Sequence, residues 1–206
     1  MGAVAVGVVR AAELDAVTLD AHGTMLRVVD PLPRLQELLP GHDPAAIVEA
    51  FRTEGRFYQE HVGTGLDAPS LEQLREDCVG VFNGALGASL TAEQYVAAIR
   101  FEVLPGVVES LERLRSLGLA LAVVGNWDFS LHERLAEAGL AGYFATVVHA
   151  ARKPDPAGLR LALERLGVHS GRALHVGDEE ADEQAANAAG MRFARTPLAA
   201  AAAELT

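Results

Sequence analysis

Residues 16–26 read AVTLDAHGTML, an apolar segment that runs directly into Asp20 and then into a Gly-Thr turn. The apolar and β-branched residues 16–19 predict a buried strand. Open α/β sheets carry their active sites beyond the carboxyl ends of the strands, so Asp20 is a candidate catalytic group. His22, two residues further on, is a second titratable side chain in the same turn. The stretch therefore predicts an α/β fold and the sheet edge at which its chemistry lies.

Composition limits the kinds of partner that the chain can have. Its 206 residues are half hydrophobic, which is enough for one core plus a small accessory unit. No apolar run approaches the roughly 18 residues of a membrane helix. A net charge of -11 argues against attraction to nucleic acid or anionic lipid, so an anionic substrate would need a locally positive pocket. The single cysteine, Cys78, fits a reducing cytoplasm, and we expect a cytoplasmic monomer or homodimer without membrane or nucleic-acid partners.

Helical patterns dominate the segment that follows the first strand. Apolar residues recur at helical spacing over 44–60 and over 70–86, and Thr91-Ala92-Glu93-Gln94 has the form of a capping box that opens a further helix. We therefore expect an inserted helical unit, the cap, over residues 30–101. The remaining residues, 1–29 and 102–206, form the expected core, with residues 1–10 as a loosely docked extension or an edge strand.

Strands alternate with helices from Leu104-Pro105-Gly106 onward. Short apolar runs predict strands over 119–124, 144–148, 173–176 and 191–194, with helices between them and an Ala-rich helix over 198–205. This alternation implies right-handed βαβ units and a parallel sheet of about five strands flanked by helices, a Rossmann-like α/β fold.

Polar residues follow four of the five predicted strands, and a parallel sheet would gather them at one edge. They are Asp20 with His22, Gly125 with Asn126, Lys153, and Asp178 with Asp182. In this order and spacing they resemble the motifs of the haloacid dehalogenase superfamily, in particular hydrolases with a helical cap inserted after the first strand. The resemblance runs from about Ala16 to Ala194 and implies the strand order 5-4-1-2-3, numbered along the chain.

The resemblance also implies a mechanism, in which Asp20 attacks phosphorus and forms an aspartyl intermediate beside a bound Mg²⁺. A carboxylate can approach a phosphate only where cations suppress their repulsion, which is the role implied for Mg²⁺ and Lys153. The implied metal ligands are Asp20, Asp178 and the backbone carbonyl of His22, since Mg²⁺ prefers oxygen. Asp182 would orient the metal's water shell or Lys153.

Two positions differ from the pattern of the phosphatases. His22 stands where a second aspartate usually protonates the leaving oxygen, and an imidazole can act as general acid or base. Gly125 stands where Ser or Thr usually binds a phosphate oxygen, which leaves backbone N–H groups and Asn126, with Thr24 as a further candidate. On the cap, Arg52 lies about where an arginine would meet a substrate carboxylate.

Structural explanations compete with these roles. Asp20 could form a turn, Asp178 and Asp182 could cap a helix, and Lys153 could be a solvated loop residue. We interpret His175 and His149 as packing residues rather than metal ligands. Three function classes remain open: a Mg²⁺-dependent phosphatase of a small phosphorylated metabolite, a 2-haloacid dehalogenase that uses the same aspartate without metal, and a binding protein that has lost turnover.

Overall fold

The computed structural model of the chain describes residues 10–205, which form two compact units. The core unit comprises the chain up to Arg27, Val103–Asn126 and the chain from Leu131 onward. The helical unit comprises Val28–Glu102 and Trp127–Ser130. Nearly all of the expected N-terminal extension lies outside the described residues, and the division into domains at residues 30 and 101 stays a prediction. Among the described residues, none of the helices is both long and apolar enough to span a bilayer.

A five-stranded sheet forms the centre of the core unit. Its order is β5-β4-β1-β6-β7 and all four pairings are parallel, which confirms the predicted order when it is read from the other edge. The strands are β1 (Ala16–Leu19), β4 (Ala120–Val124), β5 (Thr146–Val148), β6 (Ala173–Gly177) and β7 (Arg192–Arg195). Every residue of β1 is fully buried, because this strand has neighbours on both sides and helices over both faces.

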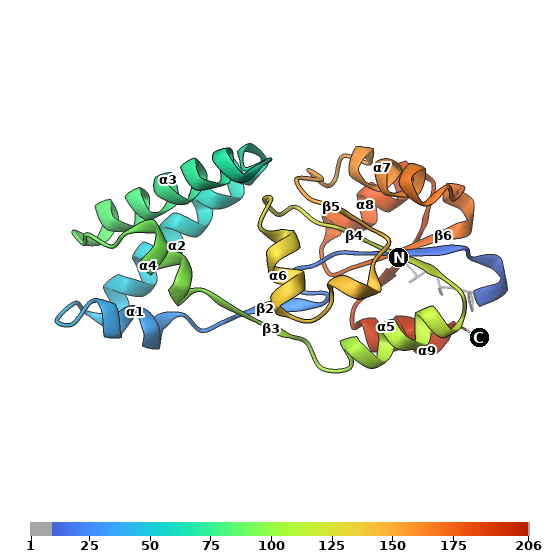
Figure 1. Cartoon of the computed structure of the whole chain (residues 1–206), viewed down its shortest axis with the longest axis horizontal. Coiled ribbons are helices and arrows are strands. Elements are labelled where there is room, and N and C mark those ends of the chain that lie inside the picture. Colours follow the sequence, from blue (N-terminus) through green and yellow to red (C-terminus); the bar gives the residue numbers. More distant parts are fainter. Residues whose placement is uncertain (1–9, 206) are drawn as a thin grey trace, which may run out of the picture. The chain divides into compact units, whose positions relative to one another are not determined.

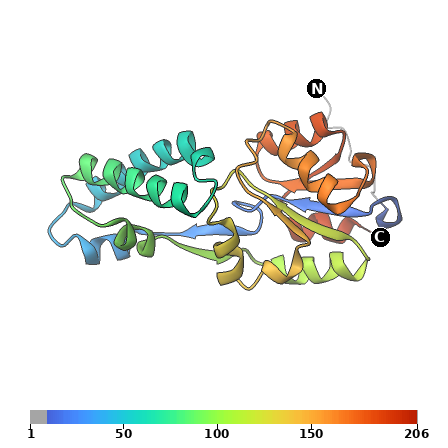
Figure 2. The same cartoon turned by 45° about the horizontal axis from the view of Figure 1, so that its top comes forward.

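Helices cover the two faces of this sheet (Figures 1 and 2). They are α7 (Ala157–Leu166) and α8 (Glu180–Ala189) on one face and α5 (Val107–Ser116) and α9 (Leu198–Glu204) on the other. The unit also contains α6 (Leu131–Glu137) and the short 3₁₀ turns η1 (Ala11–Glu13), η3 (Ala141–Tyr143) and η4 (Ser170–Arg172). Ala185 and Ala186 of α8 are buried in the same apolar cluster as Ala16 of β1, so small side chains let α8 lie close to the sheet.

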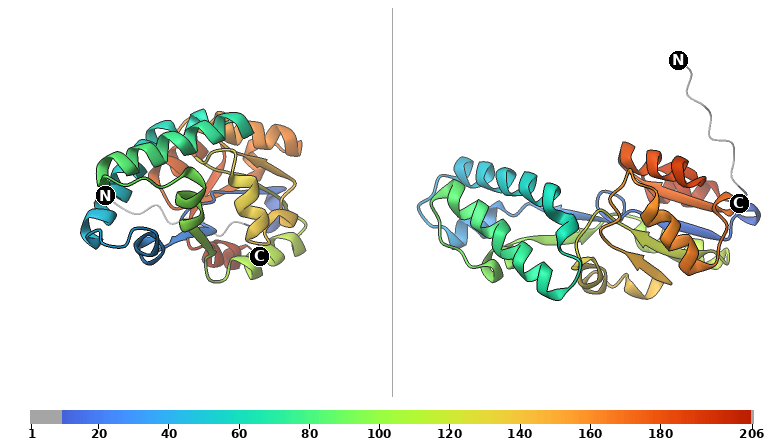
Figure 3. Two further views of the ribbon diagram at one scale, coloured as in Figure 1. Left: turned by 60° about the vertical axis from the view of Figure 1, so that its left-hand side comes forward. Right: turned by 90° about the horizontal axis from the view of Figure 1, so that it is seen from above.

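The helical unit contains α1 (Leu32–Leu38), α2 (Pro44–His61), η2 (Val62–Thr64), α3 (Ala68–Leu86) and α4 (Ala92–Ala98). Helices α2 and α3 pack side by side (Figure 3), and their predicted positions are confirmed. The capping box of α4 is also confirmed, with Gln94 N donating to Thr91 Oγ1 over 3.2 Å and Thr91 N donating to Gln94 Oε1 over 3.0 Å. Helix α1 was not predicted, since its seven residues bury only Leu35 and give a weak periodic signal.

Two further strands have no counterpart among the predicted strands. β2 (Leu26–Val29) and β3 (Arg100–Val103) pair in a separate two-stranded sheet. Each contains a point at which the chain passes from one unit to the other. Neither strand is fully buried along its length, so neither shows the continuous apolar run that marks the strands of the main sheet.

The segment Trp127–Ser130, which follows β4, belongs to the helical unit. Tyr58 Oη donates to Asp128 Oδ2 over 3.0 Å, and Phe129 N donates to the Gly65 carbonyl over 2.8 Å. The ring of Trp127 packs against that of Phe101, with centroids 4.8 Å apart. This segment lies within the expected core range 102–206, because nothing in its sequence pattern shows these long-range partners.

Candidate active site

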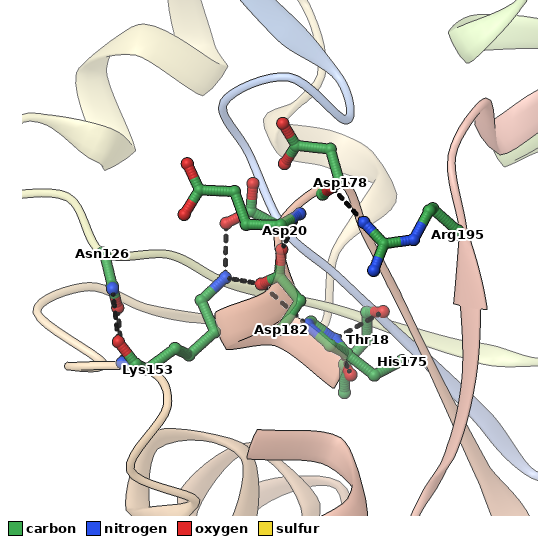
Figure 4. A network of polar contacts seen from close by, with 9 residues as sticks. Thr18, Asp20, Asn126, Lys153, His175, Asp178, Asp182 and Arg195 are labelled. Atoms are coloured by element: carbon green, nitrogen blue, oxygen red, sulfur yellow. Dashed lines mark hydrogen bonds and ion pairs between the residues drawn. The ribbon is translucent and has the colours of Figure 1, made fainter. Parts of the chain in front are cut away.

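A buried lysine links two buried carboxylates at the carboxyl edge of the sheet (Figure 4). Asp20 follows β1 directly, and its backbone N–H extends the strand ladder by donating to the Val176 carbonyl over 2.9 Å. The Lys153 ammonium lies 2.5 Å from Asp20 Oδ1 and 2.5 Å from Asp182 Oδ1. The sheet therefore brings together three residues that the sequence singled out, from the ends of β1 and β5 and from the first turn of α8.

Lys153 is held by the backbone of its loop as well as by its charge. Its backbone N–H donates to Asn126 Oδ1 over 2.7 Å, and Asn126 Nδ2 donates to the Lys153 carbonyl over 2.9 Å. Ala150 and Arg152 in this loop have φ of 50° and 57°, a left-handed conformation that is costly for non-glycine residues. Asn126 thus positions Lys153, a role that the sequence did not suggest, and phosphate binding by Asn126 stays a prediction.

Asp182 reaches the site because β6 ends in a glycine. A Cβ at Gly177 would lie 2.3 Å from Asp182 Cγ, so only glycine lets the first turn of α8 approach the strand so closely. Asp182 Oδ2 accepts the backbone N–H of Glu179 over 3.0 Å, which joins its carboxylate to the start of the helix. Helix capping by Asp182 and its contact with Lys153 therefore occur together.

Asp178 is the third carboxylate of the site. Its Oδ1 is buried and has no hydrogen-bond partner within the described chain, while Asp20, Asp178 and Asp182 each offer an oxygen within 4.8 Å of the others. Gly23 has φ of 75°, a conformation that favours glycine, and a Cβ there would lie 2.1 Å from Asp178 Oδ2 and displace that carboxylate. Arg195 donates to the Asp178 carbonyl over 2.6 Å and so braces the loop after β6.

Burial and charge act in opposite directions on these groups. Burial, aided by the Asp182 charge, raises the pKa of Asp20 although Lys153 opposes it. Burial also raises the pKa of Asp178. For Asp182 burial is outweighed by its bond to His175 and by the Lys153 charge, which lower its pKa, while the two carboxylates outweigh burial and raise the pKa of Lys153. At neutral pH this keeps Lys153 charged and Asp182 ionised.

The arrangement fits a hard divalent cation. Asp20 and Asp178 supply carboxylate oxygens, the ligand type that Mg²⁺ prefers. Asp178 Oδ1 is buried without a hydrogen-bond partner among the described residues, so a bound cation would satisfy it. Asp182 is less available as a ligand, since one oxygen accepts from Lys153 and His175 and the other from Glu179. The acidic cluster can therefore hold a metal, with Asp182 in the supporting role.

The other predicted site residues lie in varied environments. His22 is exposed, and Thr24 is 2% exposed with its hydroxyl buried and unpartnered in the described chain. The N–H of Gly125 donates to the Val148 carbonyl over 3.0 Å, so this group is not available to a phosphate as expected. Arg52 belongs to α2 of the helical unit, where its exposed guanidinium lies 3.6 Å from Glu49. Roles for His22, Thr24 and Arg52 stay predictions.

His175 is buried against the Phe193 ring, as expected of a packing residue, but its hydrogen bonds were not predicted. Its Nδ1 lies 2.8 Å from Thr18 Oγ1 and its Nε2 lies 3.3 Å from Asp182 Oδ1. Thr18 and His175 are paired in register on adjacent strands. A signal was present: each lies two residues before a residue of the site edge, Asp20 and Gly177, so period-two alternation turns both toward one face.

Comparison with known proteins agrees with this geometry. Residues 14–190 match the family model of haloacid dehalogenase-like hydrolases. The chain belongs to this family. This chain is 31% identical over 190 residues to phosphoglycolate phosphatase 1 of Pseudomonas aeruginosa. The match covers 86% of the chain and 67% of that protein. Two other curated relatives are each covered over 41% of their length, so the chain spans only part of several of its relatives.

Solved structures of the haloacid dehalogenase-like family share the fold. An L-2-haloacid dehalogenase from Xanthobacter autotrophicus, with chloropropionic acid covalently bound, has a TM-score of 0.65 at 24% identity, covering 89% of this chain and 77% of that chain. A family phosphatase from Thermococcus onnurineus has a TM-score of 0.57 at 24% identity, with coverages of 87% and 85%. At such identities the similarity shows the architecture and does not choose between the two chemistries.

Proposed function

We propose that this hydrolase is a Mg²⁺-dependent phosphatase of a small phosphorylated metabolite, with Asp20 as nucleophile. The observation that carries the proposal is the pairing of Asp20 with Lys153 beside Asp178, whose buried Oδ1 lacks a protein partner within the described residues. A carboxylate that attacks phosphorus needs a cation beside it. Displacement of a halide from carbon needs no metal, so it would not use Asp178 as a metal ligand. Mg²⁺ held by Asp20 and Asp178 would neutralise charge on the transferring phosphoryl group.

The residues then divide the reaction between them. An Asp20 oxygen attacks phosphorus, and the ester oxygen leaves with its bonding electrons and takes a proton from His22 or from solvent. Water attacks the phosphorus of the aspartyl phosphate, and the P–O bond to Asp20 breaks, which releases inorganic phosphate and restores the carboxylate. Lys153 stays protonated throughout and balances the charge of the nucleophile. Cytoplasmic location and a monomeric or dimeric state stay predictions.

The leaving group tests both Asp20 and His22. p-Nitrophenolate departs without a proton, whereas an alkoxide needs an acid, so we expect wild-type turnover of p-nitrophenyl phosphate to exceed that of 2-phosphoglycolate. The name of the Pseudomonas aeruginosa relative suggests 2-phosphoglycolate as the alkyl substrate to assay. His22→Asp should raise turnover of the alkyl ester about 10-fold or more and leave the aryl ester within a few-fold.

Asp20→Asn should abolish turnover of both esters, and EDTA should do the same to the wild type. Asp15→Asn is the matched control, because Asp15 is exposed and immediately precedes the opposite end of β1. Turnover that survives Asp20→Asn would overturn nucleophilic catalysis by this residue. Turnover that survives EDTA would overturn the metal requirement.

A dehalogenase remains the second candidate, because His22 stands where the phosphatases have a second aspartate and the Asp20–Lys153 pair needs no metal to displace a halide. The same panel distinguishes the two with 2-chloropropionate. Release of chloride in EDTA, without phosphatase activity in Mg²⁺, would favour this candidate. No turnover of any ester or haloacid, with Mg²⁺ still bound at equilibrium, would favour a binding protein.

A further inference from the structure

His175 is fully buried on β6, yet both of its ring nitrogens have polar partners from different elements. Burying an imidazole in an apolar core is costly unless each nitrogen is satisfied, so an arrangement of this kind needs partners in fixed places. One partner is Thr18 on the neighbouring strand and the other is Asp182 on α8. His175 is therefore the link between the centre of the sheet and the carboxylate that binds Lys153.

The partners assign one tautomer to the ring. An ionised Asp182 carboxylate only accepts hydrogen bonds, so His175 Nε2 must carry the hydrogen and donate it. A neutral ring carries one hydrogen, so Nδ1 accepts from the Thr18 hydroxyl 2.8 Å away and does not donate to the Thr18 carbonyl 3.2 Å away. The result is a directed chain of hydrogen bonds from Thr18 through His175 to Asp182.

This chain bears on where the Lys153 ammonium lies. Asp182 Oδ1 accepts from both His175 and Lys153, and Lys153 is shared at 2.5 Å with Asp20. An ammonium is a compact charge without a preferred plane, so its place between two carboxylates depends on where their oxygens are held. Without the His175 N–H, Asp182 Oδ1 would lose its neutral donor and keep the Lys153 ammonium, which would then move from Asp20 toward Asp182.

We propose that His175, supported by Thr18, is a positioning residue for the hydrolytic reaction. It fixes the Asp182 carboxylate so that Lys153 is shared equally with the nucleophile Asp20 (Figure 4). The proposal rests on the phosphatase function proposed above for its effect on rate. Its geometric part, the location of the ammonium, stands separately and has its own measurement.

The sequence makes that measurement simple, because Lys153 is the only lysine of the chain. Protein labelled with ¹⁵N-lysine gives a single side-chain ammonium signal. We expect His175→Phe, which keeps a ring and removes both nitrogens, to shift this signal. His175→Gln retains an N–H near the position of Nε2 and should return it close to the wild-type position. His169→Gln, at an exposed histidine on the same unit, is the control that should not shift it.

Kinetics supply the second readout. With p-nitrophenyl phosphate we expect His175→Phe to lower kcat about 10-fold with KM within about 2-fold, and His175→Gln to recover most of kcat. A structural role would instead lower the amount of folded enzyme and affect both variants alike. If His175→Phe fails to fold, the double variant Thr18→Val, His175→Phe replaces it in both measurements. It removes the Thr18 hydroxyl together with the imidazole, so no buried hydroxyl is left unpaired.

The outcomes separate the two proposals. A folded His175→Phe with an unshifted ammonium signal overturns the positioning role, as does a His175→Gln signal shifted as far as that of His175→Phe. An inactive wild type with the expected signal shifts overturns the proposed function and leaves the positioning of Lys153 supported. Active wild type with kcat unchanged in folded His175→Phe overturns the effect on rate.

Discussion

The two units give their buried acidic side chains different hydrogen-bond donors. In the core unit, Asp20 and Asp182 share the Lys153 ammonium. In the helical unit, Glu54 accepts from the Tyr95 hydroxyl over 2.8 Å and Asp128 from the Tyr58 hydroxyl over 3.0 Å. Lys153 is the one lysine or arginine buried among residues 10–205, so the acids of the helical unit have neutral donors instead.

The contrast shows what sets the charge of a buried acid. Burial raises the pKa of Glu54, and the Tyr95 hydroxyl only partly opposes this. The bond to His175 and the Lys153 charge instead lower the pKa of Asp182 below its usual value despite burial. Asp182 is thus kept ionised in the core unit, where Lys153 balances its charge, while Glu54 in the helical unit is pushed toward its neutral form.

Lys153→Met removes the charged donor that distinguishes the core unit from the helical unit, and it has the largest expected effect. It leaves Asp20 and Asp182 buried without their cation, so we expect a loss of about 3–5 kcal/mol in the free energy of unfolding, measured with urea. Adding Asp20→Asn should recover part of this loss, because one of the two uncompensated charges is then gone. Arg152→Gln, at the exposed neighbouring cation, is the control. A loss below about 1 kcal/mol would mean that the ion pairs contribute little.

Glu54→Gln tests the opposite case through pH. Because the pKa of Glu54 is raised by folding, its stabilising contribution is present below the unfolded-state pKa of about 4.3 and is lost as pH rises through the folded-state value. Glutamine keeps an oxygen for Tyr95 and does not ionise. The variant and the wild type should therefore differ little at pH 4, while the variant should be more stable by on the order of 1–2 kcal/mol at pH 8.

Glu49→Gln is the control for this pH dependence, since Glu49 lies exposed on the same helix, 3.6 Å from Arg52. Thermal or urea unfolding at both pH values measures the difference. A Glu54→Gln variant that loses stability at pH 8 would show that Glu54 is a stabilising ionised acid, and the contrast between the units would then disappear.

Tyr58→Phe has the smallest expected effect and sharpens the comparison. It removes the donor to Asp128 Oδ2, while Oδ1 still accepts from Ser130 N over 2.7 Å. We expect a loss of about 1 kcal/mol in the free energy of unfolding. Tyr143→Phe is the control, because its hydroxyl lies 3.5 Å from an exposed Glu112 and should matter less than about 0.5 kcal/mol. Equal losses in both variants would show that the buried Tyr58–Asp128 hydrogen bond stabilises the fold no more than the exposed Tyr143–Glu112 contact.

Much of this protein was determined by local sequence. Apolar runs fixed the strands of the main sheet, and their order followed from the family resemblance that the strand-end residues revealed. Asp20, Lys153 and Asp182 were predicted together because parallel strands deliver their carboxyl ends to one edge, whatever else the chain does. The structure explains two glycines of these motifs: Asp178 lies against Gly23 and Asp182 lies against Gly177, where a Cβ would be in the way.

The tertiary structure alone decided the partners of groups whose pattern is ambiguous. His175 reads as an apolar-strand residue until Thr18 and Asp182 are found on either side of it. The sequence predicts Asn126 as a phosphate ligand but does not show that its amide bonds the Lys153 backbone, 27 positions along the chain. A strand or turn pattern reports which residues are buried, because burial follows from periodicity. Hydrogen-bond partners between distant segments depend on how those segments pack, which no local pattern contains.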